Sequence, residues 1–293
     1  MRYGVGYLGS KNRIAKDIVN ALPSGKRFID LFGGGGAISH CAALSGKFET
    51  VVYSDIIPSI VDLVDNLFKG KYANNPNIFE WVSRQRFFAE LNSNPIIRWC
   101  WSFGTNGKDY LYGIGIEAQK EAIHKAIVDA VYSPQFLAIT GGEIPFHRSG
   151  VSGRKKDWLA FCRKHLHSVD AHRVPHIERL SCIQSLINLE QIAGSSPVSG
   201  IHCMTRSYTD YDYEAGDVVY CDIPYKGTAC KSYSGFDHQA FWEWARRVPC
   251  YVSEYNAPAD FECVWEKRLA ILTDTDGTHG HAMERLYRSP ACI

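Results

Sequence analysis

Residues 222–225 place an acid, a proline and an aromatic ring directly after the apolar run 218–221. The Asp222 carboxylate can accept a hydrogen bond from an exocyclic amine, and the main-chain carbonyl of Ile223 can accept a second one. Pro224 stiffens the turn, and Tyr225 can stack on the face of a ring. These four residues could therefore hold a flat ring that bears an amino group, and they are the candidate catalytic residues.

Four consecutive glycines, residues 33–36, follow Phe32 at the end of another predicted strand and open a predicted helix. Glycine lets a ligand approach the backbone because it has no Cβ. A dinucleotide fingerprint does not fit, since its last glycine or alanine would fall at Ile38 or Ser39. The pattern favours a ligand without phosphates, and a tight strand–helix turn without any ligand is the alternative.

Asp55 ends the next predicted strand along the chain. In doubly wound sheets an acid at this position accepts hydrogen bonds from ribose hydroxyls. Its alternative role is to cap the helix that begins at Pro58. The glycine turn and Asp55 together suit the adenosyl group of a bound ligand.

Lys11 follows a second glycine-rich segment, residues 4–9, and lies in the first turn of a predicted helix. The helix dipole disfavours a cation at this end of a helix. A bound carboxylate would explain Lys11, and a solvated lysine is the alternative.

Strand and helix patterns alternate at the start of the chain and return near its end, which predicts a doubly wound, mostly parallel α/β sheet. The expected elements are helix 10–21, strand 27–32, helix 37–45, strand 50–54, a helix from residue 58, and strands 218–221, 250–254 and 269–272. Between them the expected helices are 78–91, 116–132, 156–167 and 177–192. We therefore expect a discontinuous core, residues 1–60 plus 197–293, with a mostly helical insert over residues 61–196.

The composition limits the classes of protein that the chain can represent. Its 293 residues are 45% hydrophobic, so a large core can be buried, and its formal net charge is only +1. A nucleic-acid contact would therefore have to be a local basic patch. No apolar run approaches the ~20 residues of a membrane-spanning helix. The ten cysteines include no Cys-x-x-Cys pair, and we expect no signal peptide. We expect a cytoplasmic protein with reduced thiols, without a membrane or metal partner.

The order of these motifs resembles that of the Dam-type (D12 class) DNA adenine methyltransferases, most of all the phage-borne members. The matching motifs are Tyr-x-Gly-Ser-Lys at residues 7–11, Phe-x-Gly-x-Gly at 32–36, the strand-end Asp55, a helical insert and Asp-x-Pro-Tyr at 222–225. Segments 101–107, 110–113 and 252–258 also resemble those proteins.

The resemblance implies a methyltransferase that uses S-adenosylmethionine as methyl donor and the exocyclic amine of a flipped adenine in double-stranded DNA as acceptor. Carried over by position, the residues that would border this cofactor are Tyr7, Lys11, Phe32, Gly34, Gly36, Asp55 and Asp222. Lys11 would lie near the methionine carboxylate of the cofactor, and Asp55 would hold its ribose. Residues 222–225 would hold the adenine.

The chain departs from the family pattern at two positions. Ile223 replaces the first proline of the usual Asp-Pro-Pro-Tyr, which is tolerable because a backbone carbonyl acts there. Gly6 lies where the enzymes specific for GATC have a base-contacting lysine, so a GATC target is in doubt. Two other functions stay open, namely methylation of the cytosine exocyclic amine and DNA binding without catalysis.

The insert is expected to contact DNA through a basic segment and an aromatic loop. Lys and Arg outnumber Asp and Glu between residues 147 and 179, although a solvated helix face is the alternative. The loop 103–112 could enter DNA or form a packed hairpin. The candidate DNA contacts are Asn106, Lys108, Tyr110, Arg148, Arg154, Lys155 and Lys156. The histidines of this segment lack acid or thiol partners at ligand spacing, so no metal is expected.

Overall fold

The computed structural model describes residues 3–7, 9–72, 75, 77–165, 183, 187–188, 201–226, 235–272 and 279–292. The chain divides into two compact units. The first combines Met1–Lys69 with Ile192–Ile293, and the second is Gly70–Gln191. The divisions drawn from the sequence, after residues 60 and 196, fall several residues from these boundaries.

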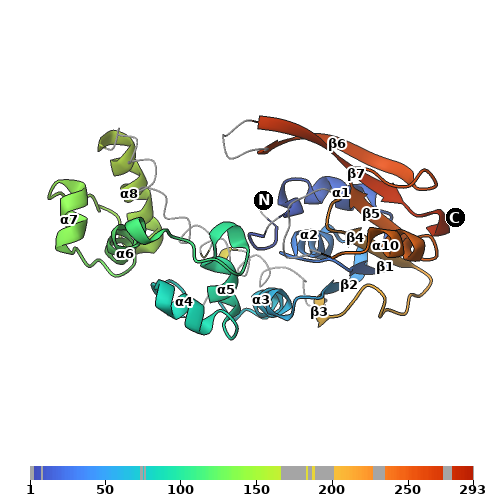
Figure 1. Cartoon of the computed structure of the whole chain (residues 1–293), viewed down its shortest axis with the longest axis horizontal. Helices are drawn as coiled ribbons and strands as arrows, with labels where there is room; N and C mark the ends of the chain where they lie inside the picture. The colour runs from blue at the N-terminus through green and yellow to red at the C-terminus, as the bar shows by residue number, and fades with distance from the viewer. Residues whose placement is uncertain are drawn as a thin grey trace. The chain divides into compact units, whose positions relative to one another are not determined.

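The first unit is built on a seven-stranded sheet of order β3–β2–β1–β4–β5–β7–β6 (Figure 1). Strands β1 to β5 pair in parallel, and β7 runs antiparallel to both β5 and β6. The strands are β1 (Gly25–Asp30), β2 (Phe48–Asp55), β3 (Ile201–Thr205), β4 (Asp217–Asp222), β5 (Cys250–Glu254), β6 (Glu262–Leu272) and β7 (His279–Arg288). The doubly wound, mostly parallel α/β fold predicted from the sequence is confirmed.

The helices of the first unit largely follow the sequence pattern. They are α1 (Ala15–Ala21), α2 (Ala37–Ser45), α3 (Pro58–Phe68) and α10 (His238–Ala245), with short 3₁₀ helices at Lys11–Arg13 and Pro290–Cys292. The single helix expected over residues 10–21 is instead a 3₁₀ turn followed by α1, because Ile14 between them has non-helical backbone angles. Pro58 stands at the start of α3, where its missing N–H costs nothing.

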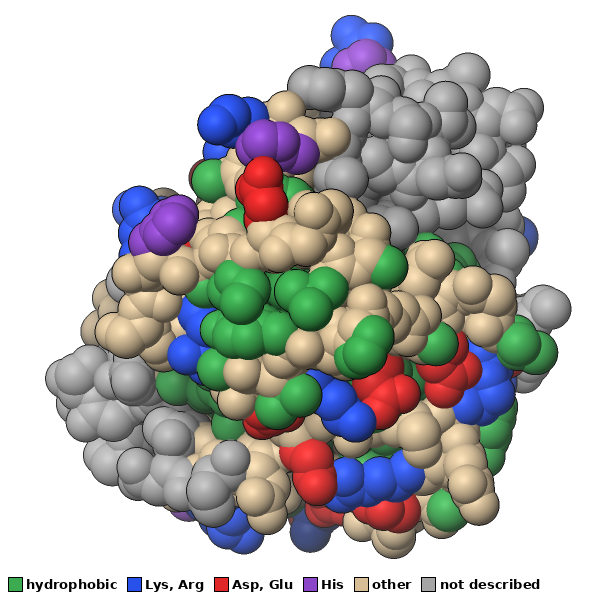
Figure 2. Space-filling model, turned by 90° about the vertical axis from the view of Figure 1, so that its left-hand side faces the viewer, with side chains coloured by type: hydrophobic (Ala, Val, Ile, Leu, Met, Phe, Trp, Pro, Cys, Tyr) green, Lys and Arg blue, Asp and Glu red, His purple; other side chains and the backbone are tan. Residues whose placement is uncertain are grey.

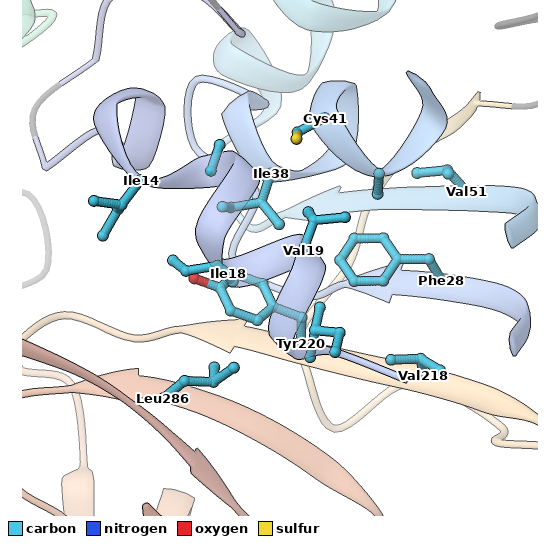
Figure 3. Packing of buried hydrophobic residues seen from close by; sticks show 13 residues of the cluster. Ile14, Ile18, Val19, Phe28, Ile38, Cys41, Val51, Val218, Tyr220 and Leu286 are labelled. Atoms are coloured by element: carbon cyan, nitrogen blue, oxygen red, sulfur yellow. The ribbon is translucent and has the colours of Figure 1, made fainter. Parts of the chain in front are cut away.

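Buried apolar side chains cover both faces of this sheet, which explains the continuous apolar runs of its strands. One cluster joins Ile18 of α1 and Ile38 of α2 to Phe28 of β1 and Tyr220 of β4 (Figure 3). A second cluster packs Phe241 of α10 against the opposite side chains of the central strands. Full burial of each such side chain stabilises the fold by about 1.5–3 kcal/mol.

In the second unit the described elements are mostly helical. They are α4 (Arg84–Glu90), α5 (Pro95–Cys100), α6 (Ile114–Val128), α7 (Pro134–Thr140) and α8 (Gly150–His165), with a 3₁₀ turn at Phe103–Thr105. The helix expected over residues 177–192 falls almost entirely outside the described residues. Among the helices that the structure describes, none combines the length and apolar character that crossing a membrane requires.

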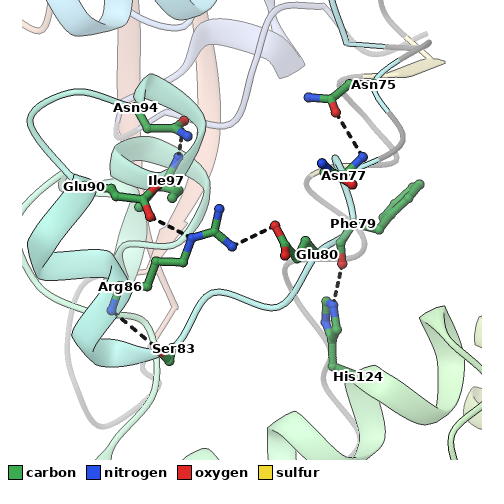
Figure 4. A network of polar contacts seen from close by, with 10 residues as sticks. All are labelled: Asn75, Asn77, Phe79, Glu80, Ser83, Arg86, Glu90, Asn94, Ile97 and His124. Carbon is green, nitrogen blue, oxygen red and sulfur yellow. Dashed lines mark hydrogen bonds and ion pairs between the residues drawn. The ribbon is translucent and has the colours of Figure 1, made fainter.

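The helix expected over residues 78–91 is helical only within α4, because polar contacts fix the preceding segment in another conformation (Figure 4). Arg86 donates to Glu80 at 2.7 Å and to Glu90 at 2.8 Å. His124 Nε2 lies 2.6 Å from the carbonyl oxygen of Phe79, and burial lowers the pKa of His124. The neutral imidazole therefore donates its Nε2 proton and ties this segment to α6.

Candidate active site

The predicted catalytic segment and the glycine turn begin at the ends of neighbouring strands. Strand order reverses direction between β1 and β4, and ligands of doubly wound sheets bind at such a switch point, beyond the carboxyl ends of the strands. Ile29 of β1 pairs with Val219 of β4, and the N–H of Leu31 donates to the Tyr220 carbonyl at 3.0 Å. The chain therefore leaves both strands at the same edge of the sheet.

Hydrogen bonds from β2 hold the glycine turn. The N–H of Gly33 donates to Ser54 O at 2.8 Å, and the N–H of Gly34 donates to Asp55 Oδ2 at 3.0 Å. The Tyr53 hydroxyl donates to Gly34 O at 2.6 Å. Asp55 Oδ1 accepts from the N–H of Ile57 at 2.9 Å. Each carboxylate oxygen has two lone pairs, so Asp55 retains the capacity to accept further hydrogen bonds.

The turn leaves no space for side chains. A Cβ on Gly33 would lie 2.2 Å from Cε2 of Tyr53, which is fully buried. Gly36 has φ +71° and caps α2, a conformation that strains any residue with a Cβ. Tyr7 lies against the turn, since its ring is 3.0 Å from where a Cβ on Gly34 would stand. These contacts bring Tyr7, Gly34 and Gly36 of the predicted site together.

Lys11 forms an ion pair with the candidate catalytic acid, although the two residues are far apart in the sequence. Lys11 Nζ lies 2.8 Å from Asp222 Oδ1, and the two side chains are 9% and 20% exposed. The ammonium also lies 4.4 Å from the centre of the Tyr225 ring. Burial lowers the pKa of Lys11, but the carboxylates of Asp222 and Glu284 outweigh it and leave that pKa raised. Lys11 is therefore a charged partner of the predicted catalytic segment.

Residues 7–112 match the family model of the D12 class N6 adenine-specific DNA methyltransferases. This match contains Lys11, the glycine turn and Asp55, and it confirms the predicted resemblance over this part of the chain. No curated protein matches the chain. The D12 class match supports adenine-specific DNA methylation, with DNA as the substrate.

Outside the D12 class match, acidic side chains hold the segment that follows β4. The Tyr225 hydroxyl donates to Glu284 Oε2 at 2.7 Å. Both oxygens of the buried Glu254 accept main-chain hydrogen bonds, from Lys226 at 3.1 Å and from Tyr255 at 2.7 Å. Glu254 is the last residue of the strand predicted over residues 250–254, so the sequence indicated where Glu254 lies but not which groups it binds.

Ile223 and Pro224, the two central residues of the predicted catalytic segment, are held by different contacts. The Pro224 carbonyl lies 2.8 Å from His238 Nε2. The Ile223 side chain is buried in the core cluster that includes Phe241. Sequence reasoning missed His238, because no pattern in the chain links α10 to this turn.

Phe32 belongs to an aromatic cluster on the same face of the sheet. Its ring centre lies 5.6 Å from that of Tyr208, in a stacked arrangement, and 5.8 Å from those of Phe236 and Phe241. The side chain is only partly buried. Phe32 therefore anchors the start of the glycine turn to the core.

Asp30 is a buried carboxylate of this site that sequence reasoning missed. Ser39 donates to its Oδ2 at 2.6 Å, and a hydrogen bond from the main-chain N–H of Phe32 also favours the charged carboxylate. Burial raises the pKa of Asp30 to about 7, and the nearby carboxylates of Asp222 and Asp55 add to this rise. The described residues contain no group of three His, Cys, Asp or Glu side chains that could hold a metal ion.

We expect Asp30→Asn to be more stable at pH 8 than at pH 4 when each is compared with the wild type at the same pH. The quantity compared is the free energy of unfolding of the variant minus that of the wild type. The folded-state pKa of Asp30 is about 7, above its ordinary value of 3.8. Asp30 therefore contributes stability that is fully present below about pH 4 and is lost as the pH rises through about 7. The asparagine cannot ionise, so the pH-dependent part of the difference should reach roughly 2–4 kcal/mol. Denaturant unfolding at both pH values measures it, and a difference independent of pH would contradict the prediction.

The predicted DNA-contacting loop of the D12 class match is a hairpin closed by a bridge between Ser102 and Tyr110. Tyr110 is buried and donates its hydroxyl to Val82 O at 2.7 Å, so its side chain is part of the core and unavailable to DNA. Asn106 Oδ1 accepts from the main-chain N–H groups of Lys108 and Asp109 and shapes the turn. Lys108 is exposed.

Two of the basic residues predicted to bind DNA in and just before α8 have partners within the second unit. Arg154 donates to the carbonyls of Ile127 at 2.5 Å and Val128 at 2.8 Å, at the end of α6. Arg148 forms an ion pair with the buried carboxylate of Asp157. Of the other two, Lys155 is half-buried and Lys156 is exposed. The sequence shows how many basic residues this segment has, but it does not show that Arg148 and Arg154 bind other residues of the second unit.

Proposed function

We propose that this protein transfers a methyl group from S-adenosylmethionine to the exocyclic amine of an adenine flipped out of double-stranded DNA. The observation that carries the proposal is the position of Asp222, whose carboxylate ends the strand beside the glycine turn. An acceptor for an amine and a cradle for a cofactor thereby share one edge of the sheet. The D12 class match supports the choice of adenine.

The residues around the glycine turn suit S-adenosylmethionine, which supplies an electrophilic methyl group on a sulfonium. The glycines of the turn carry no Cβ, so its backbone can lie against a ligand. Asp55 has acceptor capacity for the ribose hydroxyls. Ile56 is 56% exposed directly after Asp55 and offers an apolar surface to an adenine ring, and sequence reasoning missed it. Asp30 Oδ1 is a buried acceptor for a cationic donor.

The segment after β4 would hold the base. Flipping an adenine out of the duplex costs a few kcal/mol, which stacking and edge contacts must offset. Asp222 and the Ile223 carbonyl would accept the two amine hydrogens, while Tyr225 would contact the face of the ring. Lys11 binds Oδ1 of Asp222 and orients the carboxylate, which keeps acceptor capacity for the amine. Positioning would then supply most of the rate acceleration, without a covalent intermediate. The proton released by the amine would pass to Asp222 or to solvent.

The second unit offers side chains suited to DNA. Phe103 is 65% exposed within the 3₁₀ turn of the hairpin, and an exposed apolar residue of this kind can wedge between base pairs. Lys108, Lys156, Arg163 and Lys164 are exposed and could contact phosphates. On the face of the molecule shown in Figure 2, described Lys and Arg side chains are interspersed with Asp and Glu around a hydrophobic centre. DNA contact would therefore depend on local groups rather than on a uniformly basic face.

Incubation of the purified protein with S-adenosylmethionine and DNA tests the proposal directly. The DNA is digested to nucleosides, which are separated and weighed by mass spectrometry. N6-methyladenine is the expected product. N4-methylcytosine would show the alternative acceptor instead. No methylated nucleoside, together with no binding of S-adenosylmethionine in isothermal titration, would overturn the proposal and favour a non-catalytic DNA-binding protein.

The Ile56→Ala variant should bind S-adenosylmethionine about 10-fold more weakly than the wild type, because burying an isoleucine side chain against a ligand is worth about 1.5–3 kcal/mol. Isothermal titration gives the dissociation constant. The matched control is Ile114→Ala in α6, since Ile114 is also highly exposed but lies in the second unit. An unchanged affinity in Ile56→Ala would exclude this contact.

A further inference from the structure

We infer that Glu284 is a positioning residue that fixes the Tyr225 ring by binding its hydroxyl. The inference rests on the proposed function, in which Tyr225 contacts the face of the flipped adenine. Glu284 comes from β7, a strand that the sequence did not reveal.

The register of the sheet explains how a residue of β7 reaches a segment that follows β4. β5 lies between these strands, and its last residue, Glu254, pairs with Arg285 of β7. β7 runs antiparallel to β5, so Glu284 lies one residue past the carboxyl end of β5. The segment after β4 leaves the sheet at the same edge. Glu284 can therefore reach Tyr225 past the end of the intervening strand.

The contact is a short hydrogen bond between a phenol and a carboxylate. The Tyr225 hydroxyl lies 2.7 Å from Glu284 Oε2, and Glu284 is only 8% exposed. Burial raises the pKa of Tyr225, and the carboxylates of Asp222 and Glu284 raise it further, so the hydroxyl stays protonated and can donate. A hydrogen bond to a charged acceptor is stronger and more directional than one between neutral groups.

Glu284 has no ion pair with Lys, Arg or His in the described part of the chain. A buried carboxylate without such a partner is costly unless hydrogen bonds and nearby charge compensate it. The Tyr225 hydroxyl supplies the hydrogen bond. Lys11, which is paired with Asp222, lies close enough for the Glu284 carboxylate to raise the pKa of Lys11. Glu284 thus contacts the tyrosine and influences the lysine of the proposed site.

Two further contacts confine the same ring. Tyr255 meets Tyr225 edge-on, with ring centres 4.6 Å apart at 77°, and the Lys11 ammonium lies 4.4 Å from the ring centre. Neither contact fixes the direction of the hydroxyl, whereas Glu284 does. Loss of Glu284 should therefore let the hydroxyl end of the ring shift without unfolding the site.

Methyl transfer by Glu284→Leu tests the inference. Its kcat should fall about 10-fold, in line with the loss of a hydrogen bond to a charged group, while its affinity for S-adenosylmethionine stays at the wild-type value. Glu284→Gln keeps an acceptor oxygen and should recover most of the activity. The matched control is Glu262→Leu on β6, because Glu262 is an exposed carboxylate paired with Arg288 and should leave kcat unchanged.

The Tyr225→Phe variant separates positioning from a general structural role. It removes only the hydroxyl, so it should lower kcat about as much as Glu284→Leu, and the double variant should be no slower than either single variant. An unchanged kcat in Tyr225→Phe would overturn the inference even if Glu284→Leu failed to fold. Additive losses in the double variant would also overturn it. A wild type that methylates no DNA would overturn the proposed function, whereas an active wild type with a fully active Glu284→Leu variant would overturn this inference alone.

Discussion

The Asp222→Ala variant is expected to transfer methyl groups about 10²–10³-fold more slowly than the wild type, the range seen when one preorganised polar group is removed from an active site. Asp222 ends β4 next to the glycine turn, and its partly exposed carboxylate is the proposed acceptor for the adenine amine. DNA affinity should be largely retained, because the proposed phosphate contacts lie in the second unit. Single-turnover transfer from labelled S-adenosylmethionine measures the first quantity, and fluorescence anisotropy of labelled DNA measures the second.

The control for this experiment must separate lost chemistry from lost stability. Asp222→Ala leaves the buried Lys11 ammonium without its counterion, and breaking a buried ion pair costs about 3–5 kcal/mol. Asp217 is a matched carboxylate at the opposite end of the same strand, where it pairs with Arg27 at 2.6 Å. Asp217→Ala should lower stability, but at temperatures below its melting temperature it should transfer methyl groups as fast as the wild type. Near-normal transfer by Asp222→Ala, or an equal loss in Asp217→Ala, would remove Asp222 from the mechanism.

The edge of the sheet that carries the proposed site could be predicted because its signals are local. Buried parallel strands read as continuous apolar runs, as in residues 218–221, and a doubly wound sheet brings their carboxyl ends to one edge. The four glycines 33–36 marked the turn after β1, and Pro58 marked the start of α3. Each signal involves neighbouring residues only, so one sequence is enough to read it.

The partners within the site could not be predicted, because they join residues that no sequence pattern connects. Lys11 pairs with Asp222, and Glu284 reaches Tyr225 from an antiparallel strand. The position of Lys11 in the first turn of a predicted helix suggested that Lys11 binds a carboxylate. That expectation fits the chemistry, but the structure shows that the carboxylate of Asp222 already pairs with it.

The predicted DNA contacts of the second unit show the same limit of sequence reasoning. An aromatic-polar loop does not reveal which of its rings turn inward, and the bridge from Ser102 decides that Tyr110 is buried. A basic run does not reveal which charges are used internally, and Arg154 binds the carbonyls that α6 leaves without partners at its end. Composition measures the charge of a segment, whereas tertiary contacts decide how much of it is available to DNA.

Gly33→Ala should weaken the binding of S-adenosylmethionine at least 10-fold and lower the free energy of unfolding by about 1–3 kcal/mol, the usual cost of overpacking. The new methyl carbon would lie 2.2 Å from the Tyr53 ring. Tyr53 cannot swing away easily, because it is fully buried and its hydroxyl holds Gly34 O at 2.6 Å. The turn must therefore shift and loosen its hydrogen bonds to Ser54 and Asp55. Isothermal titration and denaturant unfolding measure the two effects.

A second substitution shows whether the clash with Tyr53 is the cause. Gly115→Ala in α6 is the control for the exchange itself, because nothing lies within 4 Å of its added Cβ, and it should leave both quantities almost unchanged. Tyr53→Leu removes the ring that the new methyl group would meet. If the clash causes the loss, adding Gly33→Ala to Tyr53→Leu should weaken cofactor binding far less than Gly33→Ala does in the wild type. An equal loss in both backgrounds would mean that the cofactor site depends on the backbone conformation of Gly33, and that its packing against Tyr53 is incidental to binding.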